Sequence, residues 1–417
     1  MTDLLAIVNI GQLVTLAVPA RPRVGAELRE LGIIENAALI VGENGRIVAA
    51  GPYIELKPLI PPGAIQIDAE KKCVTPGFVD AHTHFVFAGN RAAEFEQRIA
   101  GATYQQIAAA GGGIASTVRQ TRAATEDELL TESRRHRDWM LRAGTTTMEA
   151  KSGYGLDRET ELRMLRVMKK LNDEGPTQVV PTLLAAHCLP PEFAGRREEY
   201  VRWIVEELIP EVAAAKLALY CDAFCDDCAF TVEETRTVLE AARRNGLKVR
   251  VHAEQFRPGT GAALAAELGA VTADHLEAAT PETLALLRQA GVQPVLLPGS
   301  VFALGHTLYP PARAMVEQGL AIVIATDFNP GSSPIASMPF VLSLACLEMK
   351  LTPAEALMAA TVNAAWSLGL GNKVGSLEPG KRADFLIHEF VDYRELAYFI
   401  AAPARPRVFI GGREIST

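Results

Sequence analysis

The sequence predicts an α/β protein: a (β/α)8 TIM barrel with a small β-sandwich domain built from both termini. Three observations support this fold class. Short apolar runs alternate with helix-like segments through the middle of the chain, β-type patterns return at both ends, and histidines collect at the ends of the apolar runs. At 417 residues, the chain is long enough for a barrel and one smaller unit.

The apolar runs are the predicted barrel strands. Near-continuous apolar strands that alternate with helices are typical of a parallel sheet covered on both faces, and eight of them close a barrel. Helix-like segments between them include residues 126–142, 158–172 and 232–245. The eight runs are residues 77–84, 145–151, 178–187, 217–224, 247–254, 270–275, 292–297 and 321–327.

The two ends of the chain have β character without intervening helices. We therefore expect residues 1–72 plus 369–417 to form the β-sandwich domain and residues 73–368 to form the barrel. The expected terminal strands lie in residues 4–16, 37–49 (a hairpin around Glu43-Asn44-Gly45), 66–73, 383–387 and 407–410.

Composition and charge limit the kinds of molecule and cellular compartment that we expect for this chain. The net charge of −8 argues against nucleic acid, since phosphate binding needs a basic surface. There is no basic and apolar leader at the N-terminus and no run of ~18 apolar residues, so we expect neither a signal peptide nor a membrane span. Six cysteines are too few for a disulfide scaffold, which favours a reduced, cytoplasmic enzyme.

Histidines mark the ends of the predicted strands, where a barrel carries its active site. His82 and His84 end the first run, and their spacing places both side chains on one side of a strand. His252 lies on the fifth run, and Asp327 ends the eighth. A lone histidine there is more often an ordinary core residue, but three imidazoles and a carboxylate together form a sound site for zinc or iron.

Several motifs then resemble a known family. Val79-Asp80-Ala81-His82-Thr83-His84 looks like the first-strand signature of the amidohydrolase superfamily, and residues 375–385 are similar to the segment that re-enters its β-sandwich domain. Residues 149–156 (EAKSGYGL), 186–188 (AHC), 273–276 (ADHL) and 326–332 (TDFNPGS) resemble the imidazolonepropionase family. That likeness implies hydrolytic opening of 4-imidazolone-5-propanoate to N-formimino-L-glutamate in histidine degradation. It also implies a homodimer.

The resemblance assigns roles to individual residues. It implies one divalent or trivalent metal ion per chain, zinc or iron, held by His82, His84, His252 and Asp327. His275 matches the histidine beside the attacking water, and Asp327 is expected to pass a proton to the leaving nitrogen. Glu254 is a further catalytic candidate, because its neighbour Gln255 stands where some members carry a glutamate. The substrate contacts that it implies are Arg91, Tyr104, Tyr154, His187, Gln255, Asn329, Gly331 and Ser332.

The residues themselves agree with an acidic substrate and a single ion. Arg91 is a suitable partner for the propanoate carboxylate, although a plain surface arginine is the simpler interpretation of that residue alone. Superfamily members with two ions bridge them by a lysine at the end of the fourth barrel strand. Here that run ends without a lysine, and Lys151 lies on the second run, so one ion is expected.

Two weaker signals were weighed against ordinary structural roles. Cys221, Cys225 and Cys228 have a spacing found in iron–sulfur enzymes, but they come halfway along the barrel, and small buried cysteines explain them. The run Gly111-Gly112-Gly113 lacks the lysine and hydroxyl residue of a phosphate loop, so a flexible loop over the active site is the better interpretation.

Two rival functions stay open at this point. One is another mononuclear amidohydrolase, such as a purine or cyclic-amidine deaminase, which would not need an arginine clamp for a carboxylate. The other is a catalytically inactive barrel with a structural role, which would have lost metal ligands.

Overall fold

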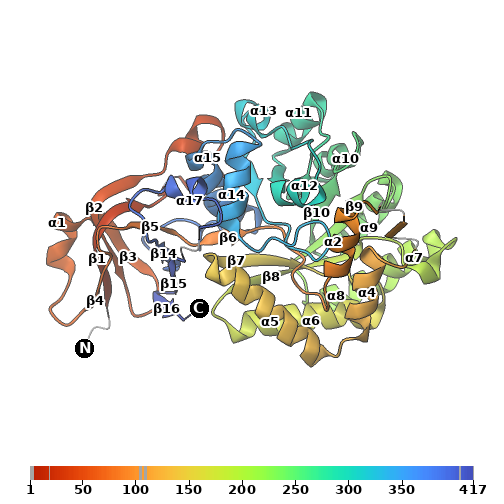
Figure 1. Ribbon diagram of the computed structural model, residues 1–417, viewed down its shortest axis with the longest axis horizontal. Helices are drawn as coiled ribbons and strands as arrows, with labels where there is room; N and C mark the ends of the chain where they lie inside the picture. Colours follow the sequence, from red (N-terminus) through yellow and green to blue (C-terminus); the bar gives the residue numbers. More distant parts are fainter. Residues whose placement is uncertain (1–3, 18, 103–105, 108–109, 403–404, 417) are drawn as a thin grey trace.

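The computed structural model describes residues 4–17, 19–102, 106–107, 110–402 and 405–416. It contains two eight-stranded sheets, one closed into the barrel and one built from both ends of the chain (Figure 1). In the figure, the red N-terminal strands and the dark blue C-terminal strands lie together in one unit beside the barrel.

The barrel sheet confirms the predicted fold class. Its strands follow one another in chain order, and every neighbouring pair is parallel. Each lies within or beside one of the eight apolar runs. The strands are β6 (Phe78–Asp80), β7 (Thr145–Lys151), β8 (Gln178–Ala186), β9 (Tyr220–Cys225), β10 (Lys248–Ala253), β11 (Thr272–His275), β12 (Gln293–Leu296) and β13 (Val323–Ile324).

The barrel closes between its first and last strands at their carboxyl ends. The Asp327 amide donates to the His82 carbonyl at 3.0 Å, and the His84 amide donates to the Phe328 carbonyl at 2.9 Å. Just below, the Thr326 hydroxyl and amide donate to the Asp80 carboxylate at 2.6 and 3.1 Å. The closing bonds therefore lie in the same two segments that carry His82, His84 and Asp327.

Helices cover the outside of the barrel, and local signals explain where the longest ones begin. Thr125 and Thr231 cap two of them and pair with Glu128 and Glu234 in capping boxes, which satisfy the free amides of the first turn. The barrel helices are α2 (Ala92–Ile99), α4 (Ile114–Ala123), α5 (Glu126–Arg142), α6 (Arg158–Glu174), α7 (Arg197–Trp203), α8 (Ile209–Ala214), α9 (Val232–Arg244), α10 (Gly261–Leu268), α11 (Pro281–Ala290), α12 (Pro298–Leu304), α13 (Ala312–Glu317), α14 (Met338–Leu347), α15 (Pro353–Met358) and α16 (Ala364–Ser367).

The second sheet joins both ends of the chain, with β5 between β1 and β14. Its apolar core includes Ile7, Leu39 and a stacked pair, Phe385 and Phe409, with ring centroids 4.4 Å apart. Its strands are β1 (Leu5–Val14), β2 (Ile33–Val41), β3 (Ile47–Pro52), β4 (Ile65–Asp68), β5 (Cys73–Pro76), β14 (Phe385–Ile387), β15 (Arg407–Ile410) and β16 (Arg413–Ile415). The short helices of this part are α1 (Tyr53–Leu56) and α17 (Glu395–Tyr398).

One terminal strand differs from expectation. Residues 66–73 were expected to form a single strand, but the chain forms β4 and β5, which pair with different stretches of β1. Glu70 and Lys71 between them have positive φ angles of 53° and 64°, which interrupt an extended backbone. The exact domain boundaries stay a prediction.

Buried polar contacts join the N-terminal segment to the barrel. The Glu355 carboxylate accepts hydrogen bonds from Arg29 at 3.0 Å and from Arg313 at 2.9 and 3.0 Å, and Asn363 bonds the backbone of Arg23 in both directions. Among the described residues, no helix is both long and apolar enough to cross a membrane.

The Glu355 contact predicts acid sensitivity. Burial alone would raise the pKa of Glu355, but hydrogen bonds from Arg313, Thr352 and Arg29 outweigh it and hold the pKa at about 2. A lowered folded-state pKa stabilises the fold above the ordinary value of 4.5, and this stability is lost as the pH falls toward 2. We expect Glu355→Gln to cost ~1–3 kcal/mol near neutral pH. Its melting temperature should converge with that of the parent protein below pH 4. The exposed Glu348→Gln is the control; a deficit for Glu355→Gln that did not change with pH would contradict the assignment.

Candidate active site

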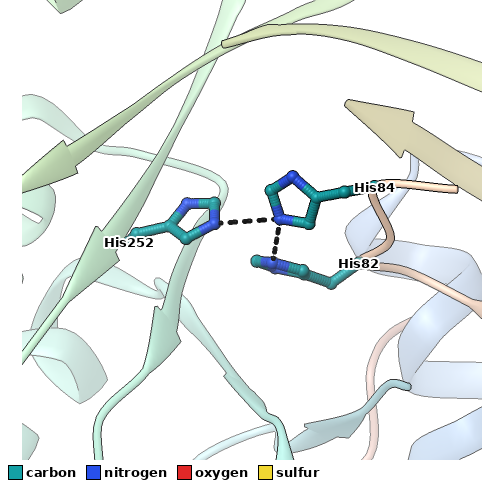
Figure 2. A group of neighbouring side chains, drawn as sticks. All are labelled: His82, His84 and His252. Atoms are coloured by element: carbon teal, nitrogen blue, oxygen red, sulfur yellow. Dashed lines mark hydrogen bonds between the residues drawn. The ribbon is translucent and has the colours of Figure 1, made fainter. Parts of the chain in front are cut away.

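Three imidazoles converge at the carboxyl end of the barrel. His82 and His84 lie just beyond β6, and His252 lies on β10 (Figure 2). The Nε2 atom of His84 is 3.3 Å from that of His82 and 3.4 Å from that of His252. Asp327 completes the group from beyond β13, with Oδ1 3.6 Å from His82 Nε2 and 3.5 Å from His84 Nε2. The structure thus brings together all four residues predicted as metal ligands.

The spacing of these atoms fits a metal ion. Ligand atoms about 2.0–2.1 Å from a tetrahedral zinc lie about 3.3–3.4 Å apart, close to the spacings seen here. The three histidines are the only such group of possible donors among the described residues, so Cys221, Cys225 and Cys228 do not form a second one. Burial lowers the pKa of His82 and His84 well below the ordinary value. Neutral imidazoles offer a lone pair to a cation.

Carboxylates hold the outer nitrogens of two of these rings. Asp274 Oδ2 lies 2.6 Å from His82 Nδ1, and Asp222 Oδ2 lies 3.0 Å from His252 Nδ1 in a less well aligned contact. A carboxylate behind a histidine fixes the ring so that its other nitrogen faces the metal. The buried Nδ1 atoms of His84 and His252 both lack a well-aligned hydrogen bond among the described residues, but His252 has the nearby Asp222 carboxylate.

A buried ion cluster lies behind these carboxylates, and sequence reasoning missed it. Lys151 Nζ is 2.7 Å from Asp222, 2.9 Å from Glu149 and 3.8 Å from Asp274. Arg250 adds a second cation 3.5 Å from Glu149. Burial alone would lower the pKa of Lys151, but Asp222 and Glu149 raise it above the ordinary value, so the group is an ammonium ion. The sequence did hold a signal for this cluster: charged residues lie inside the apolar runs, where burying an isolated charge is costly.

His275 lies beside two of the three clustered histidine rings. Its ring centroid is 5.7 Å from that of His82 and 5.4 Å from that of His252. Burial alone would lower the pKa of His275, but the Glu277 carboxylate, with Oε1 3.3 Å from Nδ1, raises it. Burial also raises the pKa of Asp327 to about 7. His275 and Asp327 are therefore two titratable groups with raised pKa values at the cluster of histidines.

His187 and Tyr154 form one wall of the site. The His187 ring stacks on His84 at 5.2 Å between centroids, and Tyr154 lies 5.4 Å from His187 and 6.0 Å from His84. Sequence reasoning missed Glu161, whose buried carboxylate accepts hydrogen bonds from the amides of Gly153, Gly155 and Leu156. Glu161 thereby fixes the loop that carries Tyr154.

Arg91 packs against the loop after β13. A Cβ atom added to Gly331 would lie 2.0 Å from Arg91 Nη1, so the guanidinium group packs directly against this glycine. Asn329 Oδ1 accepts the amides of Gly331 and Ser332 at 2.8 Å, which folds the loop back on itself. Ser332 Oγ lies 3.5 Å from Asp327 Oδ2, so this loop reaches the metal centre.

The remaining predicted residues are placed less centrally. Gln255 lines a cavity of about 360 Å³ together with Glu277 and His306. The Glu254 carboxylate accepts the Ala262 amide at the start of α10, at 3.4 Å. Burial raises the pKa of Glu254 to about 7. Tyr104 lies outside the described residues. The run at Gly111 packs near α2, where the Gly113 amide donates to Glu94.

Comparison with known proteins shows which family the chain belongs to. A model of the amidohydrolase family matches residues 73–415. An imidazolonepropionase from Solibacter usitatus (strain Ellin6076) is 55% identical over 408 residues, which cover 98% of this chain and 97% of the relative. Another from Geobacillus kaustophilus (strain HTA426) is 46% identical, covering 97% of this chain and 96% of that one. The chain belongs to the imidazolonepropionases of the amidohydrolase family.

Family membership confirms the resemblance found in the sequence and makes the chain a metal-dependent hydrolase. Solved structures of more distant proteins support the fold alone. Guanine deaminase from E. coli has a TM-score of 0.75 at 16% identity and covers 99% of both chains. A 5-methylcytosine deaminase from Klebsiella pneumoniae has a TM-score of 0.71 at 16% identity, covering 99% of this chain and 98% of that one.

The carboxylate behind His82 gives a prediction for metal binding. Asp274→Asn keeps the size of the side chain but removes its charge, so His82 is held less firmly as a ligand. We expect the dissociation constant for zinc to rise ~10–100-fold, measured by competition with a chromophoric chelator. Asp227→Asn, at an exposed aspartate after β9, is the matched control. Equal zinc affinity in both variants would show that Asp274 does not support the ligand.

Proposed function

We propose that the chain opens the ring of 4-imidazolone-5-propanoate by hydrolysis and forms N-formimino-L-glutamate, a step of histidine degradation. The observation that carries the proposal is Arg91 packed against Gly331, in the loop that also brings Ser332 to Asp327. The similarity to curated imidazolonepropionases over nearly the whole chain supports it. A guanidinium group packed against this loop suits a substrate that carries a carboxylate.

Substrate binding is assigned to Arg91 and to the wall formed by His187 and Tyr154. Arg91 would bind the propanoate carboxylate through its Nη atoms, since its Nε already donates to Glu94 at 2.8 Å. Tyr154 and Tyr104 would donate hydroxyl hydrogen bonds. His187 would contact the ring, because its Nδ1 is engaged with the Gly153 carbonyl at 3.0 Å and its other nitrogen faces away from that bond. Asn329, Gly331, Ser332 and Gln255 would complete the contacts.

Proton transfer is assigned to Asp327 and His275. When bound, a metal ion at the four ligands lowers the pKa of water toward ~7 and polarises the substrate carbonyl. Asp327 would accept the proton of the attacking water and deliver it to the leaving ring nitrogen. His275 would orient that water by accepting one of its protons at Nε2. Glu254 is the weaker catalytic candidate, because its carboxylate faces the start of α10.

We further propose one ion per chain, zinc or iron. The donor set of three nitrogens and a carboxylate suits either metal. Lys151 is fully buried in ion pairs with Asp222 and Glu149, so its amine is occupied and would not bridge a second ion. A homodimeric assembly and a cytoplasmic location are proposed from the family resemblance and the composition.

The substrate assignment predicts the effect of losing the guanidinium group. The parent protein should turn over synthetic imidazolone propionate, followed as loss of its ultraviolet absorbance. Arg91→Ala should raise KM ~10–100-fold, since it removes charge-assisted hydrogen bonds, and should leave metal content unchanged. Arg119→Ala, at an exposed arginine of α4, is the control. No turnover by fully metal-loaded parent protein, or turnover of guanine in its place, would contradict the substrate assignment and favour a deaminase.

The metal assignment predicts a single, removable ion. Dialysis against a strong chelator should abolish activity, and stepwise addition of zinc or ferrous iron should restore it with a break at one ion per chain. His84→Ala should prevent this recovery, because it removes one of the three nitrogens. Metal analysis together with the activity titration provides the measurement. A break at two ions would contradict the mononuclear site.

A further inference from the structure

The end of β11 turns back on itself in an unusual way. His275 and Leu276 have φ angles of 81° and 65°, and neither is a glycine. Residues with side chains rarely adopt this left-handed region, and such strain persists where surrounding structure requires it. The turn brings the side chain of Glu277 back to that of His275, so that Glu277 Oε1 lies 3.3 Å from His275 Nδ1.

Both partners in this contact are buried. The side chains of His275 and Glu277 are 3% and 4% exposed. The second oxygen of Glu277, Oε2, is buried and has no hydrogen-bond partner among the described residues. Burying a carboxylate without a second partner is costly, and the contact with His275 is the interaction that offsets this cost.

The contact decides which nitrogen of His275 carries a proton. In a neutral imidazole, one nitrogen donates and the other accepts, and a carboxylate at Nδ1 requires the proton to be there. Nε2 is then left with its lone pair. We propose that Glu277 is a positioning residue that holds His275 as the Nδ1-protonated form, with Nε2 available to the attacking water. This inference rests on the proposed function, in which His275 orients that water.

Glu277 also separates His275 from a cavity. The cavity has a volume of about 360 Å³, and Gln255, Ser300, His306 and Thr307 line it together with Glu277. Shortening Glu277 would therefore join this space to the side of His275 that bears Nδ1. A small carboxylate such as formate could then occupy the place of the missing group.

Steady-state kinetics of two variants test the role. Glu277→Ala should lower kcat ~10–100-fold, while KM stays within ~3-fold and metal content is unchanged. Glu277→Gln should stay within ~3-fold of the parent kcat, because an amide oxygen can still accept the Nδ1 proton. The proposal is overturned if Glu277→Ala keeps its kcat or loses its metal. It is equally overturned if Glu277→Gln falls as far as Glu277→Ala, since the charge would then matter instead of the hydrogen bond.

Chemical rescue separates positioning from a general structural defect. Sodium formate should restore the kcat of Glu277→Ala in a saturable manner, whereas sodium chloride at equal ionic strength should not. The parent protein and Thr307→Ala, a variant of the same cavity wall, should show no response to formate. Absence of rescue, or equal stimulation of Thr307→Ala, would overturn the proposal.

A spectroscopic measurement tests the inference even if the proposed substrate proves wrong. In zinc-loaded protein with 15N-labelled histidine, the His275 resonances can be assigned by their loss in His275→Asn. Long-range 1H–15N spectra should show a protonated Nδ1 in the parent protein and a shift toward protonated Nε2 in Glu277→Ala. A protonated Nε2 in the parent, or identical His275 signals in both proteins, would overturn the positioning role whatever the substrate.

Discussion

Asp80 and Thr326 hold the first and last barrel strands in register, and the metal centre depends on that register. Asp327 follows Thr326 directly, and His82 lies two residues beyond Asp80. The side chains of a strand alternate between its two faces, so a slip of one residue would turn ligands away from one another. The Asp327 amide and the His82 carbonyl bond each other across this joint. Three of the four predicted ligands thus inherit their positions from barrel closure.

The fourth ligand, His252, depends on charges below the centre. Asp222 touches both Lys151 and His252 through the same oxygen, while Asp274 holds His82. Each of these groups would be costly to bury alone, yet together they satisfy one another. The proposed metal ligands are thereby held by a layer of buried charged side chains behind them. Loss of one charge in that layer would leave its neighbours unpaired.

Sequence patterns predicted the barrel well because apolar runs and polar strand ends are local features. His82 and His84 are two residues apart, so their shared direction could be read directly from the spacing. Two sets of contacts could not be predicted from the sequence in this way. The contact of Lys151 with Asp222 depends on which strands become neighbours, and the contact of Glu161 with the Tyr154 loop depends on how that loop folds. The break between β4 and β5 was missed because the backbone reversal at Glu70 and Lys71 involves no glycine. The proposed role of Glu277 could be inferred only from the structure, because it depends on the left-handed turn at His275.

The terminal sheet has a consequence for how the chain is made in the cell. β5 pairs with β1 on one side and with β14 on the other, and β14 belongs to the last residues of the chain. The N-terminus leaves the ribosome first, and synthesis proceeds at ~5–20 residues per second. The first strands of this sheet therefore lack their C-terminal neighbours until most of the chain has been made. Asp327 also emerges late. The full set of four proposed ligands therefore exists only after most of the chain has been synthesised.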